Sequence, residues 1–579
     1  MTERLYRWTK RKMRQQLAVV DGERAPSLVL KNATYLNFAR RKWLTANIWI
    51  ADDRIVYVGK DMPKKLKGTE IVDCTGSRVV PGYIEHHAHP FQLYNPHSFA
   101  KYASHRGTTT LINDNLLFFL YLDERKALSI IEALDELPAS MYWWCRFDPQ
   151  TELEDGDIFS NSKMKKWLEH PLVVQGGELT SWPKVLTGDD YILHWMQETT
   201  RLRKPIEGHL PGASERTLAK MALLGVTSDH EAMTGEEVVR RLDLGYTTSL
   251  RYSSIRSDLP NLLKEMQELG VDYFDRCLMT TDGSPPSFYE NGVMDQLIRI
   301  ALESGLDPID AYAMASYNVA TYYQLDYKIG MIAPGRIAHI NILDSVSNPT
   351  PTSVLAKGQW IVRNGRQCEG FESFPWHDFD IGPLEIDWEL SEDELYFSMP
   401  LGLEMVNSVI LKPYQITLDT STRVLGTDHD ESFFAMLDKN GKWLITTMIK
   451  GFATHISGFA SSFSNTGDII LIGKSIADML AAFKALKEQG GGMTLVEEGQ
   501  VVGSIPLELF GILSNKPMQG IMEDEKRFVA LLRERGYKYE DPIYSLLFFS
   551  STHLPYIRVT QSGIYDVKNK TVLFPAIMR

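Results

Sequence analysis

Short apolar, β-prone runs alternate with amphipathic helical segments through the middle of the chain. Between residues 81 and 323, each such run precedes a segment in which apolar residues recur every three or four positions. The clearest helix runs from Ser214 to Leu224 and stops at Gly225. Leu218 and Met221 share its apolar face. Alternating strands and helices predict a parallel sheet with helices packed against it.

The next stretch repeats this plan. Thr234 and Glu237 have the spacing of a capping box, and the helix that they begin ends at Gly245, before a β-prone run over residues 246–250. About 250 residues is the usual length of a closed eight-stranded barrel. A doubly wound open sheet is the competing fold, but it would gather its site at one switch point. We therefore predict an α/β fold with a (β/α)8 TIM-like barrel over residues 80–329.

Both flanks of this region hold further β-prone runs. They cover residues 28–31, 46–51 and 54–58 before it and residues 338–343 and 359–362 after it. We predict that residues 27–79 and 330–370 form one small β-sandwich side domain. Residues 1–26 form a helical N-terminal extension in this interpretation. Its cations lie at residues 4, 7, 10, 11, 12 and 14, and they fit a surface helix better than a membrane or partner site, which is the alternative.

A stretch rich in Pro, Asp and Glu, residues 374–394, separates this side domain from the last part of the chain. We expect residues 371–579 to form an additional C-terminal α/β domain. Its clearest helix begins at Ser475, and its apolar stripe includes Met479 and Phe483. The triple glycine over residues 490–492 follows this helix instead of opening one, so it predicts a turn and not a phosphate site.

Composition agrees with a large multidomain enzyme. The chain has 579 residues, 44% of them hydrophobic, and a net charge of -13, which argues against nucleic acid or a membrane surface as the main partner. The four cysteines lie far apart and match no zinc or redox spacing. We read them as reduced thiols in a cytoplasmic protein without a membrane helix. A homo-oligomer is compatible with this composition.

The candidate chemistry begins with two histidines one residue apart. His87 and His89 close an apolar, β-prone run over residues 79–84. Side chains on a strand point to one face at every second residue, so these two imidazoles can bind one ion while His86 faces away. A His-x-His pair also occurs by chance on protein surfaces. A catalytic metal needs further protein ligands and an open position, so the interpretation depends on finding more candidates.

Four further candidates each come directly after a β-prone run: Glu178 after residues 172–177, His209 after residues 205–208, His230 after residues 225–229 and Asp282 after residues 277–281. Taken singly, His209 and His230 are each better explained as a buried structural histidine. Their recurrence at the ends of successive strands instead predicts a metal centre at the mouth of the barrel. Carboxylate and imidazole ligands suit iron(II), manganese or zinc, which ligand type alone cannot separate.

Several motifs together resemble the amidohydrolase superfamily, and within it the adenine deaminases. These are Pro81-Gly82-Tyr83-Ile84-Glu85-His86-His87-Ala88-His89, Gly107-Thr108-Thr109-Thr110, Glu178, Gly208-His209, Ser228-Asp229-His230-Glu231, Thr281-Asp282 and, near the C-terminus, Asp478-Met479, residues 490–492 and residues 507–514. A glutamate on the fourth strand, where many relatives carry a carboxylated lysine, and the Ser-Asp-His-Glu segment are the adenine deaminase features.

The resemblance implies a ligand set and roles. The residues His87, His89, Glu178, His209, His230 and Asp282 would hold a pair of divalent ions, manganese or iron(II) in this family, with Glu178 bridging them. Asp282 would take the proton of the attacking water and deliver it to the departing nitrogen. The substrate would be adenine or a similar small purine, converted to hypoxanthine and ammonia. Glu231 and Asp114 are the candidate substrate-binding residues, although Glu231 could instead orient a histidine ligand.

Two segments depart from the family pattern. Residues 114–117 read Asp-Asn-Leu-Leu where adenine deaminases usually have Asp-Pro-His-Glu, and residues 464–468 read Ser-Asn-Thr-Gly-Asp where the family has His-Asp-Ser-His-Asn. Neither touches the proposed ligands, yet both can alter a pocket that recognises one base by hydrogen bonds. The alternatives are therefore an amidohydrolase acting on another aminated heterocycle or a cyclic amide, and an inactive paralogue that binds a purine.

Overall fold

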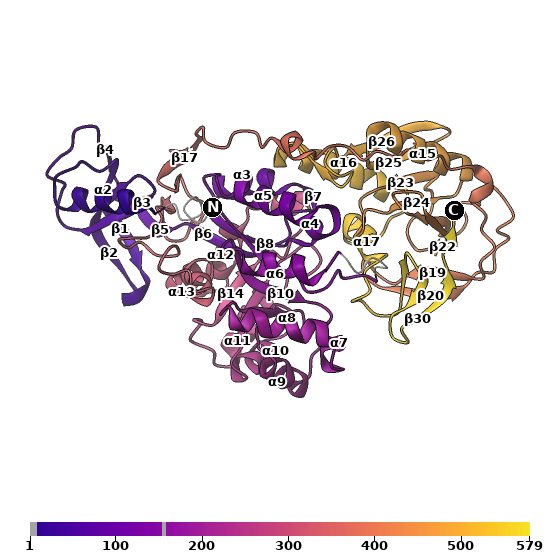
Figure 1. Ribbon diagram of the computed structural model, residues 1–579, viewed down its shortest axis with the longest axis horizontal. Coiled ribbons are helices and arrows are strands. Elements are labelled where there is room, and N and C mark those ends of the chain that lie inside the picture. The colour runs from indigo at the N-terminus through magenta and orange to yellow at the C-terminus, as the bar shows by residue number, and fades with distance from the viewer. Residues whose placement is uncertain (1–7, 153–157) are drawn as a thin grey trace.

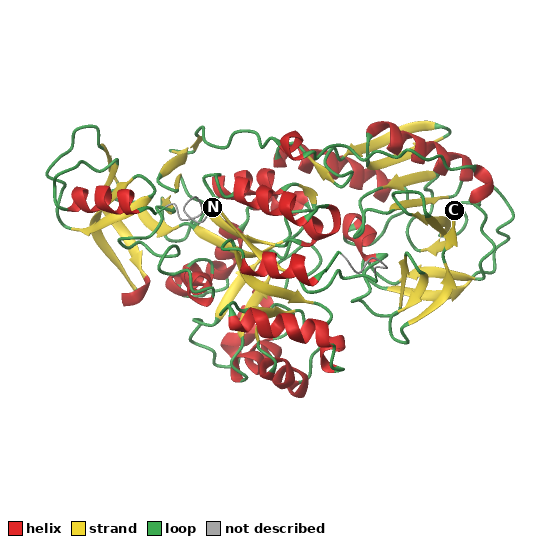
Figure 2. Cartoon of the chain, viewed as in Figure 1, coloured by secondary structure: helices red, strands yellow, loops and turns green. Residues whose placement is uncertain are grey.

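A computed structural model describes residues 8–152 and 158–579 of the chain. Three parts follow one another along the long axis of the molecule (Figure 1): a small sheet domain at one end, a central barrel wrapped by helices, and a mixed domain that carries the C-terminus. Figure 2 shows strands at the centre of the middle part with helices outside them. The prediction of a TIM-like barrel with a β side domain and a C-terminal α/β domain is confirmed.

The barrel is a sheet of eight parallel strands in the order β14-β13-β12-β11-β10-β9-β8-β6. Its strands are β6 (Tyr83–Ala88), β8 (Thr108–Asn113), β9 (Ser140–Cys145), β10 (Val173–Leu179), β11 (Ile206–Gly208), β12 (Val226–Asp229), β13 (Thr247–Arg251) and β14 (Cys277–Thr280). The helices on its outside include α3 (Pro96–His105), α5 (Glu124–Leu134), α6 (Asn161–Glu169), α8 (Asp190–Arg201), α9 (Glu215–Leu223), α10 (Gly235–Asp243), α11 (Leu259–Glu268) and α12 (Met294–Glu303). All strand C-termini therefore open on one face.

The first and last strands of the barrel meet through a side chain. The buried Glu85 on β6 accepts hydrogen bonds from the hydroxyl of Thr280, at 2.8 Å, and from the backbone N–H of Thr281, at 2.8 Å. It also accepts from the backbone N–H of His87 at 3.0 Å. One carboxylate thus links the strand that carries the histidine pair to the loop that carries Asp282, and it fixes their relative position.

Helices α9 and α10 begin at the capping residues that the sequence predicted. Ser214 caps α9, and Thr234 caps α10 by accepting from the backbone N–H of Glu237 at 3.3 Å. The Glu237 carboxylate accepts from the N–H of Met233, at 2.8 Å, instead of from Thr234, so the expected capping box is shifted by one residue. Strands β10 and β11 pack closely at Gly177, because a Cβ there would lie 2.6 Å from the carbonyl oxygen of Glu207.

The small domain is one nine-stranded sheet built from both flanks of the barrel. Its strands are β1 (Leu28–Asn37), β2 (Lys42–Ala51), β3 (Arg54–Gly59), β4 (Glu70–Asp73), β5 (Arg78–Pro81), β15 (Ile340–Leu343), β16 (Ser353–Ala356), β17 (Gln359–Arg363) and β18 (Arg366–Gln367). β15 joins the earlier strands by pairing antiparallel with β5.

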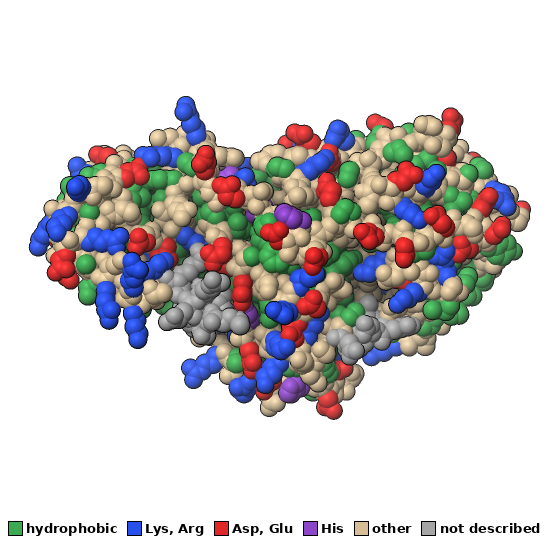
Figure 3. Space-filling model, turned by 45° about the horizontal axis from the view of Figure 1, so that its top comes forward, with side chains coloured by type: hydrophobic (Ala, Val, Ile, Leu, Met, Phe, Trp, Pro, Cys, Tyr) green, Lys and Arg blue, Asp and Glu red, His purple; other side chains and the backbone are tan. Residues whose placement is uncertain are grey.

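The N-terminal helix α2 (Lys10–Val20) buries Gln16 and Val19. Arg4 and Arg7 lie outside the described residues. Lys and Arg side chains gather at this end of the molecule (Figure 3).

The C-terminal part contains a second nine-stranded sheet. Its strands are β19 (Leu401–Met405), β20 (Leu411–Gln415), β21 (Glu431–Leu437), β22 (Trp443–Lys450), β23 (Gly458–Ser461), β24 (Ile469–Gly473), β25 (Gly492–Glu497), β26 (Gln500–Pro506) and β31 (Ile577–Met578). Helix α15 (Ile476–Gln489) begins after Ser475 and ends at Gly490, whose φ of +78° favours glycine. Gly490 and Gly491 form the predicted turn, and Gly492 begins β25. Within the described residues no helix has the length and apolar character of a membrane span.

The C-terminal part is tied to the barrel at several points. Its strand β27 (Leu513–Ser514) pairs with β7 (Leu93–Tyr94), in the loop that follows the histidine pair. Helix α16 (Met518–Glu534) contacts the turn η2 (Pro286–Asn291) after Asp282, and α17 (Pro542–Phe548) lies beside the same loop. The mouth of the barrel is therefore covered by the C-terminal part and not open to bulk solvent on all sides.

Candidate active site

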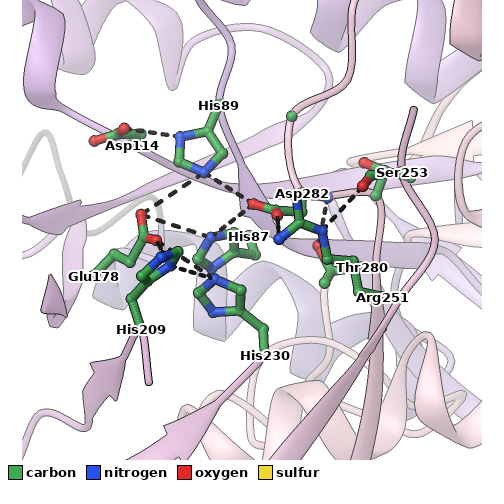
Figure 4. Close-up of polar contacts among 12 residues, drawn as sticks. His87, His89, Asp114, Glu178, His209, His230, Arg251, Ser253, Thr280 and Asp282 are labelled. Atoms are coloured by element: carbon green, nitrogen blue, oxygen red, sulfur yellow. Dashed lines mark hydrogen bonds and ion pairs between the residues drawn. The ribbon is translucent and has the colours of Figure 1, made fainter. Parts of the chain in front are cut away.

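The six proposed ligands come together at the mouth of the barrel (Figure 4). His87 lies on β6, His89 directly after it, Glu178 on β10, His209 after β11, His230 after β12 and Asp282 two residues beyond β14. Five strands thus deliver the residues that the sequence pattern placed at strand ends. Their burial is high, since His87 and His230 are fully buried and Glu178 is 3% exposed.

One group of atoms forms around the histidine pair. Oδ1 of Asp282 lies 3.2 Å from Nε2 of His87 and 3.2 Å from Nε2 of His89. Oε2 of Glu178 lies 4.0 Å and 3.9 Å from the same two nitrogens. Typical ligand bonds to such ions are about 2.0–2.2 Å, so atoms at these separations can share one cation between them.

A second group forms on the other side of Glu178. Its Oε1 lies 2.7 Å from Nδ1 of His209 and 3.4 Å from Nε2 of His230. Glu178 therefore offers a different oxygen to each group. The ligand atoms lie within 4.8 Å of one another in each of three triads: His87, His89 and Glu178; His87, His230 and Asp282; and Glu178, His209 and His230.

An unsatisfied atom indicates that this cluster fits a metal. Nε2 of His87 is buried and makes no hydrogen bond of acceptable geometry with any described residue, although Asp282 is near. A buried polar nitrogen without a partner costs about 1–3 kcal/mol. Imidazole nitrogens and carboxylates are also the donor set that divalent transition metals bind. A cation between these side chains would supply the missing interaction and neutralise the two carboxylates.

Glu207 orients two of the histidines from behind. It is fully buried, and it accepts hydrogen bonds from Nδ1 of His87 at 3.0 Å and from Nδ1 of His230 at 3.3 Å. Burial by itself would raise the pKa of Glu207, but the charge of His87 and the hydrogen bonds from both histidines lower it well below its usual value. Such a partner fixes which ring nitrogen each histidine turns toward the candidate metal position.

Asp114 and Arg146 form a second supporting layer. Asp114 accepts from Nδ1 of His89 at 2.9 Å and from Nη2 of Arg146 at 2.7 Å, while its other oxygen accepts from Nε1 of Trp144 at 2.8 Å. Nη2 of Arg146 also lies 2.8 Å from Oε2 of Glu178. Asp114 borders the cavity, but both its oxygens are engaged. Its contacts favour orienting His89 over the direct substrate contact expected from the sequence.

Glu231 is held by two arginines at the cavity wall. Its oxygens lie 2.8 Å from Nη1 of Arg251 and 2.6 Å from Nη1 of Arg256. Burial would raise the pKa of Glu231, but the charges of His209 and of these two arginines lower it to about 2. Glu231 is therefore an anion at neutral pH. Because Glu207 already occupies Nδ1 of His230, orienting that histidine does not require Glu231.

A cavity of about 310 Å³ opens above the cluster. The barrel contributes His89, Asp114, Leu116, Leu117, Glu178, His209, Glu231, Arg251 and Asp282, and the C-terminal part contributes Phe463, Ser464, Asn465, Tyr544, Leu547, Phe548 and His553. This volume lies at the lower end of the range of small-molecule sites. The two segments that depart from the family pattern, residues 114–117 and 464–468, thus border the same cavity. Tyr121 joins them, since its hydroxyl donates to the carbonyl of Thr466 at 3.2 Å.

Two residues of the C-terminal part reach the cluster itself. The hydroxyl of Tyr544 donates to the carbonyl oxygen of Gly283, next to Asp282, whose φ is +46°. The ring of His553 stands perpendicular to that of His209, with 5.6 Å between ring centroids and 89° between planes. Burial and the charge of His209 lower the pKa of His553 to about 3. The site is therefore completed by residues more than 250 positions away in the chain.

Some of these residues had a signal in the sequence and others had none. Glu207 lies two positions before His209, so strand alternation places both on one face. Arg146 directly follows β9, and Arg251 ends β13, so the strand-end pattern that indicated the candidate ligands also applies to them. Nothing near His553 or Tyr544 predicts their position, because their contacts depend on how the C-terminal part docks.

Comparison with known proteins gives matches over the whole chain. The profile of the amidohydrolase family matches residues 78–362, and that of the adenine deaminase C-terminal domain matches residues 408–571. A protein of Halalkalibacterium halodurans named "Putative adenine deaminase" is 72% identical, with 100% of both chains covered. A Bacillus subtilis protein with that designation is 51% identical over 100% of both chains. "Adenine deaminase 2" of Carboxydothermus hydrogenoformans is 27% identical, over 96% of this chain and 98% of that protein.

Solved structures with a similar fold include a β-aspartyl dipeptidase of Fervidobacterium islandicum. It is 16% identical, with a TM-score of 0.46, and the match covers 59% of this chain and 98% of that chain. A dihydropyrimidinase of Brevibacillus agri is 14% identical with a TM-score of 0.45, covering 59% of this chain and 96% of that one.

Proposed function

The chain belongs to the adenine deaminase family of amidohydrolases, and from this premise we propose that it is a metal-dependent hydrolase that converts adenine and water to hypoxanthine and ammonia. The observation that carries this proposal is the convergence of four histidines and two carboxylates beneath one cavity, in three triads that share their members. A protein that only binds a purine needs no such set.

We assign His87, His89, Glu178, His209, His230 and Asp282 as ligands of two divalent cations, manganese or iron(II), with zinc also compatible. Glu178 is suited to bridge them because its two oxygens face different histidine pairs. When bound, such cations lower the pKa of water toward neutrality and so provide hydroxide for attack. Burial raises the pKa of Glu178, but the charges of Arg146 and His209 keep it well below its usual value.

Asp282 is proposed to carry the proton. Burial raises the pKa of its carboxyl, but the charge of Arg251 and the adjacent imidazoles of His87 and His89 lower it well below the usual range. Asp282 is thus ionised, and we propose that it accepts a proton from the attacking water and delivers it to the departing amino nitrogen. The new oxygen–C6 bond forms, the C6–nitrogen bond breaks and ammonia leaves. One hydrogen of water ends on ammonia and the other on the ring nitrogen of hypoxanthine.

The ring of the substrate would lie in the cavity against Glu231. Arg251 and Arg256 hold this carboxylate in place, so it can accept a hydrogen bond from a ring or amino N–H without reorganising. We propose this contact as the main role of Glu231. A small-molecule substrate follows from the size of the cavity, whereas a cytoplasmic location and a homo-oligomer stay predictions.

A second candidate is a different aminated heterocycle or a cyclic amide. The observation that favours it is the apolar wall formed by Leu116, Leu117 and Phe548 beside the cluster. Two leucines stand where the family pattern has polar residues, and removing hydrogen-bond donors and acceptors from a pocket changes which bases it accepts. Release of ammonia separates a deaminase from an amide hydrolase.

The test is turnover by the purified full chain loaded with manganese or iron(II). We expect adenine to give equal amounts of hypoxanthine and ammonia, and chelation of the metal to abolish this. Aminated purines, pyrimidines and pterins compared on the same preparation establish which base is preferred. An Asp282→Asn variant should keep its fold and lose about 10²–10⁴-fold in kcat, the usual contribution of a proton-transfer residue. Activity unchanged in this variant would reject the proton-transfer role, and failure on adenine with success on another base would reject only the substrate.

A further inference from the structure

The wall of the cavity that comes from the C-terminal part carries polar atoms without protein partners. His553 borders the cavity, and its Nδ1 makes no hydrogen bond to a described residue. Its Nδ1 is out of contact with solvent. Nδ2 of Asn465, on the same wall, is also buried and without a partner among the described residues. Each such atom costs about 1–3 kcal/mol unless something binds it.

Polar groups on the barrel side of the cavity already have protein partners. The oxygens of Glu231 contact two arginines, and those of Asp114 accept hydrogen bonds from Trp144, Arg146 and His89. His553 instead stands edge-on to His209, at 5.6 Å between centroids, directly beside the cluster where the reacting atom must lie. A neutral imidazole presents one donor and one acceptor, which can pair with the edge of a nitrogen heterocycle.

We propose that His553 is a substrate-contacting residue that the C-terminal domain adds to the barrel's active site, where it hydrogen-bonds the heterocyclic base beside His209. The proposal rests on the proposed deaminase function. It assigns this domain a part in recognition of the base, in addition to covering the mouth of the barrel.

A structural role is the competing explanation, because the ring could simply hold His209 in position by edge-on packing. The two roles differ in what they require. Packing needs an aromatic ring and no nitrogen, whereas recognition needs the nitrogens. His553→Phe keeps the ring and removes both nitrogens. His553→Asn keeps a donor and an acceptor and removes the ring.

The chain also offers a matched control. His194 is an exposed histidine on α8, and its ring makes an edge-on contact with Trp195, at 4.8 Å and 72°. His194→Phe makes the same chemical change at the same kind of contact, far from the cavity. It should leave metal content, melting temperature and kinetics unchanged.

The experiment measures kcat and KM for adenine, bound metal and melting temperature in the full-length, metal-loaded proteins. Adenine binding to each His553 variant combined with Asp282→Asn, by calorimetry, gives an affinity that does not depend on turnover. We expect His553→Phe to keep its metal and melting temperature, to raise KM and Kd for adenine at least 10-fold, and to change kcat less. His553→Asn should recover part of the lost affinity.

Three results would overturn the inference. His553→Phe could match the wild type within twofold, in which case the nitrogens contact nothing in the substrate. His553→Phe could lose bound metal together with activity. Alternatively, His553→Asn could lose metal while His553→Phe keeps all its activity. Either result would show that the ring serves packing. If the wild type turns over no adenine, the proposed adenine deaminase function is rejected independently of the role of His553. The variants are then compared on whichever base of the panel releases ammonia.

Discussion

Arg146 lies against Glu178, with Nη2 of the guanidinium 2.8 Å from Oε2 of the carboxylate, and both side chains are buried. The same nitrogen lies 2.7 Å from Asp114, so one cation holds two anions that would otherwise repel. We expect Arg146→Met to lower metal affinity about 10–100-fold, the usual effect of removing a residue that orients a ligand. Manganese titration of the metal-free protein measures it.

The control for Arg146 is a surface pair of the same chemistry. Arg201 on α8 is 57% exposed and lies 2.7 Å from Glu198. An exposed pair contributes only about 0–1 kcal/mol, so Arg201→Met should leave metal affinity and activity as they are. Equal metal affinity in Arg146→Met and the wild type would show that Glu178 needs no support from Arg146.

Glu207 should matter for metal binding although it touches no metal position. Glu207→Gln leaves one carbonyl oxygen for two histidine N–H groups, those of His87 and His230. One ring must then lose its acceptor or turn. We expect about a 10–100-fold weaker metal affinity, with a corresponding loss of kcat/KM at limiting manganese. A kcat/KM that returns fully at saturating manganese would fit this role, and unchanged affinity would contradict it.

Tyr544 ties the C-terminal domain to the turn of Asp282. Tyr544→Phe removes the donor for the Gly283 carbonyl and frees a backbone whose φ at Asp282 is +46°. We expect kcat to fall about 10-fold or more, because small displacements of a reacting group are costly. Tyr539→Phe is the matched variant, since Tyr539 donates to the carbonyl of Met405 at 2.6 Å within the C-terminal domain. Tyr539→Phe should lose a similar amount of stability and keep its activity. Equal kinetics in the two variants would contradict a role of Tyr544 in positioning Asp282.

The contact between α16 and the barrel should make stability depend on pH. Glu525 accepts from the N–H and the hydroxyl of Ser287, and burial, with the charge of Asp541, raises its pKa to about 8. The folded chain then keeps a proton that the unfolded chain loses above about pH 4.5. Stability from this group is therefore present below pH 4.5 and is lost as pH rises through 8.

Glu525→Gln should remove this dependence. The variant, which keeps an acceptor for Ser287, is expected to gain stability relative to the wild type between pH 5 and 8, by on the order of a few kcal/mol at most. Melting temperatures of the metal-loaded proteins at both pH values measure the difference. A constant difference across this range would show that Glu525 does not titrate there.

The amino-acid sequence by itself determined the features that depend on near neighbours. Helix α9 begins after Ser214 and α15 after Ser475 because capping hydroxyls and apolar periodicity act within a few residues. His87 and His89 share a strand face for the same reason. The strand-end positions of Glu178 and His230 follow from the alternation of strands and helices, and the resemblance of these motifs correctly indicated the family.

The tertiary structure alone decided which distant residues complete the site. Asp114 at the cavity border pairs with His89 and Arg146, Glu207 contacts two histidines at once, and His553 reaches His209 from the other end of the chain. Such contacts join residues tens to hundreds of positions apart. The contacts of Asp114 and Glu207 form because closure of the barrel brings neighbouring strand ends together. The contact of His553 forms because the C-terminal domain docks on the mouth of the barrel, and no local pattern of spacing or propensity encodes where that docking places a side chain.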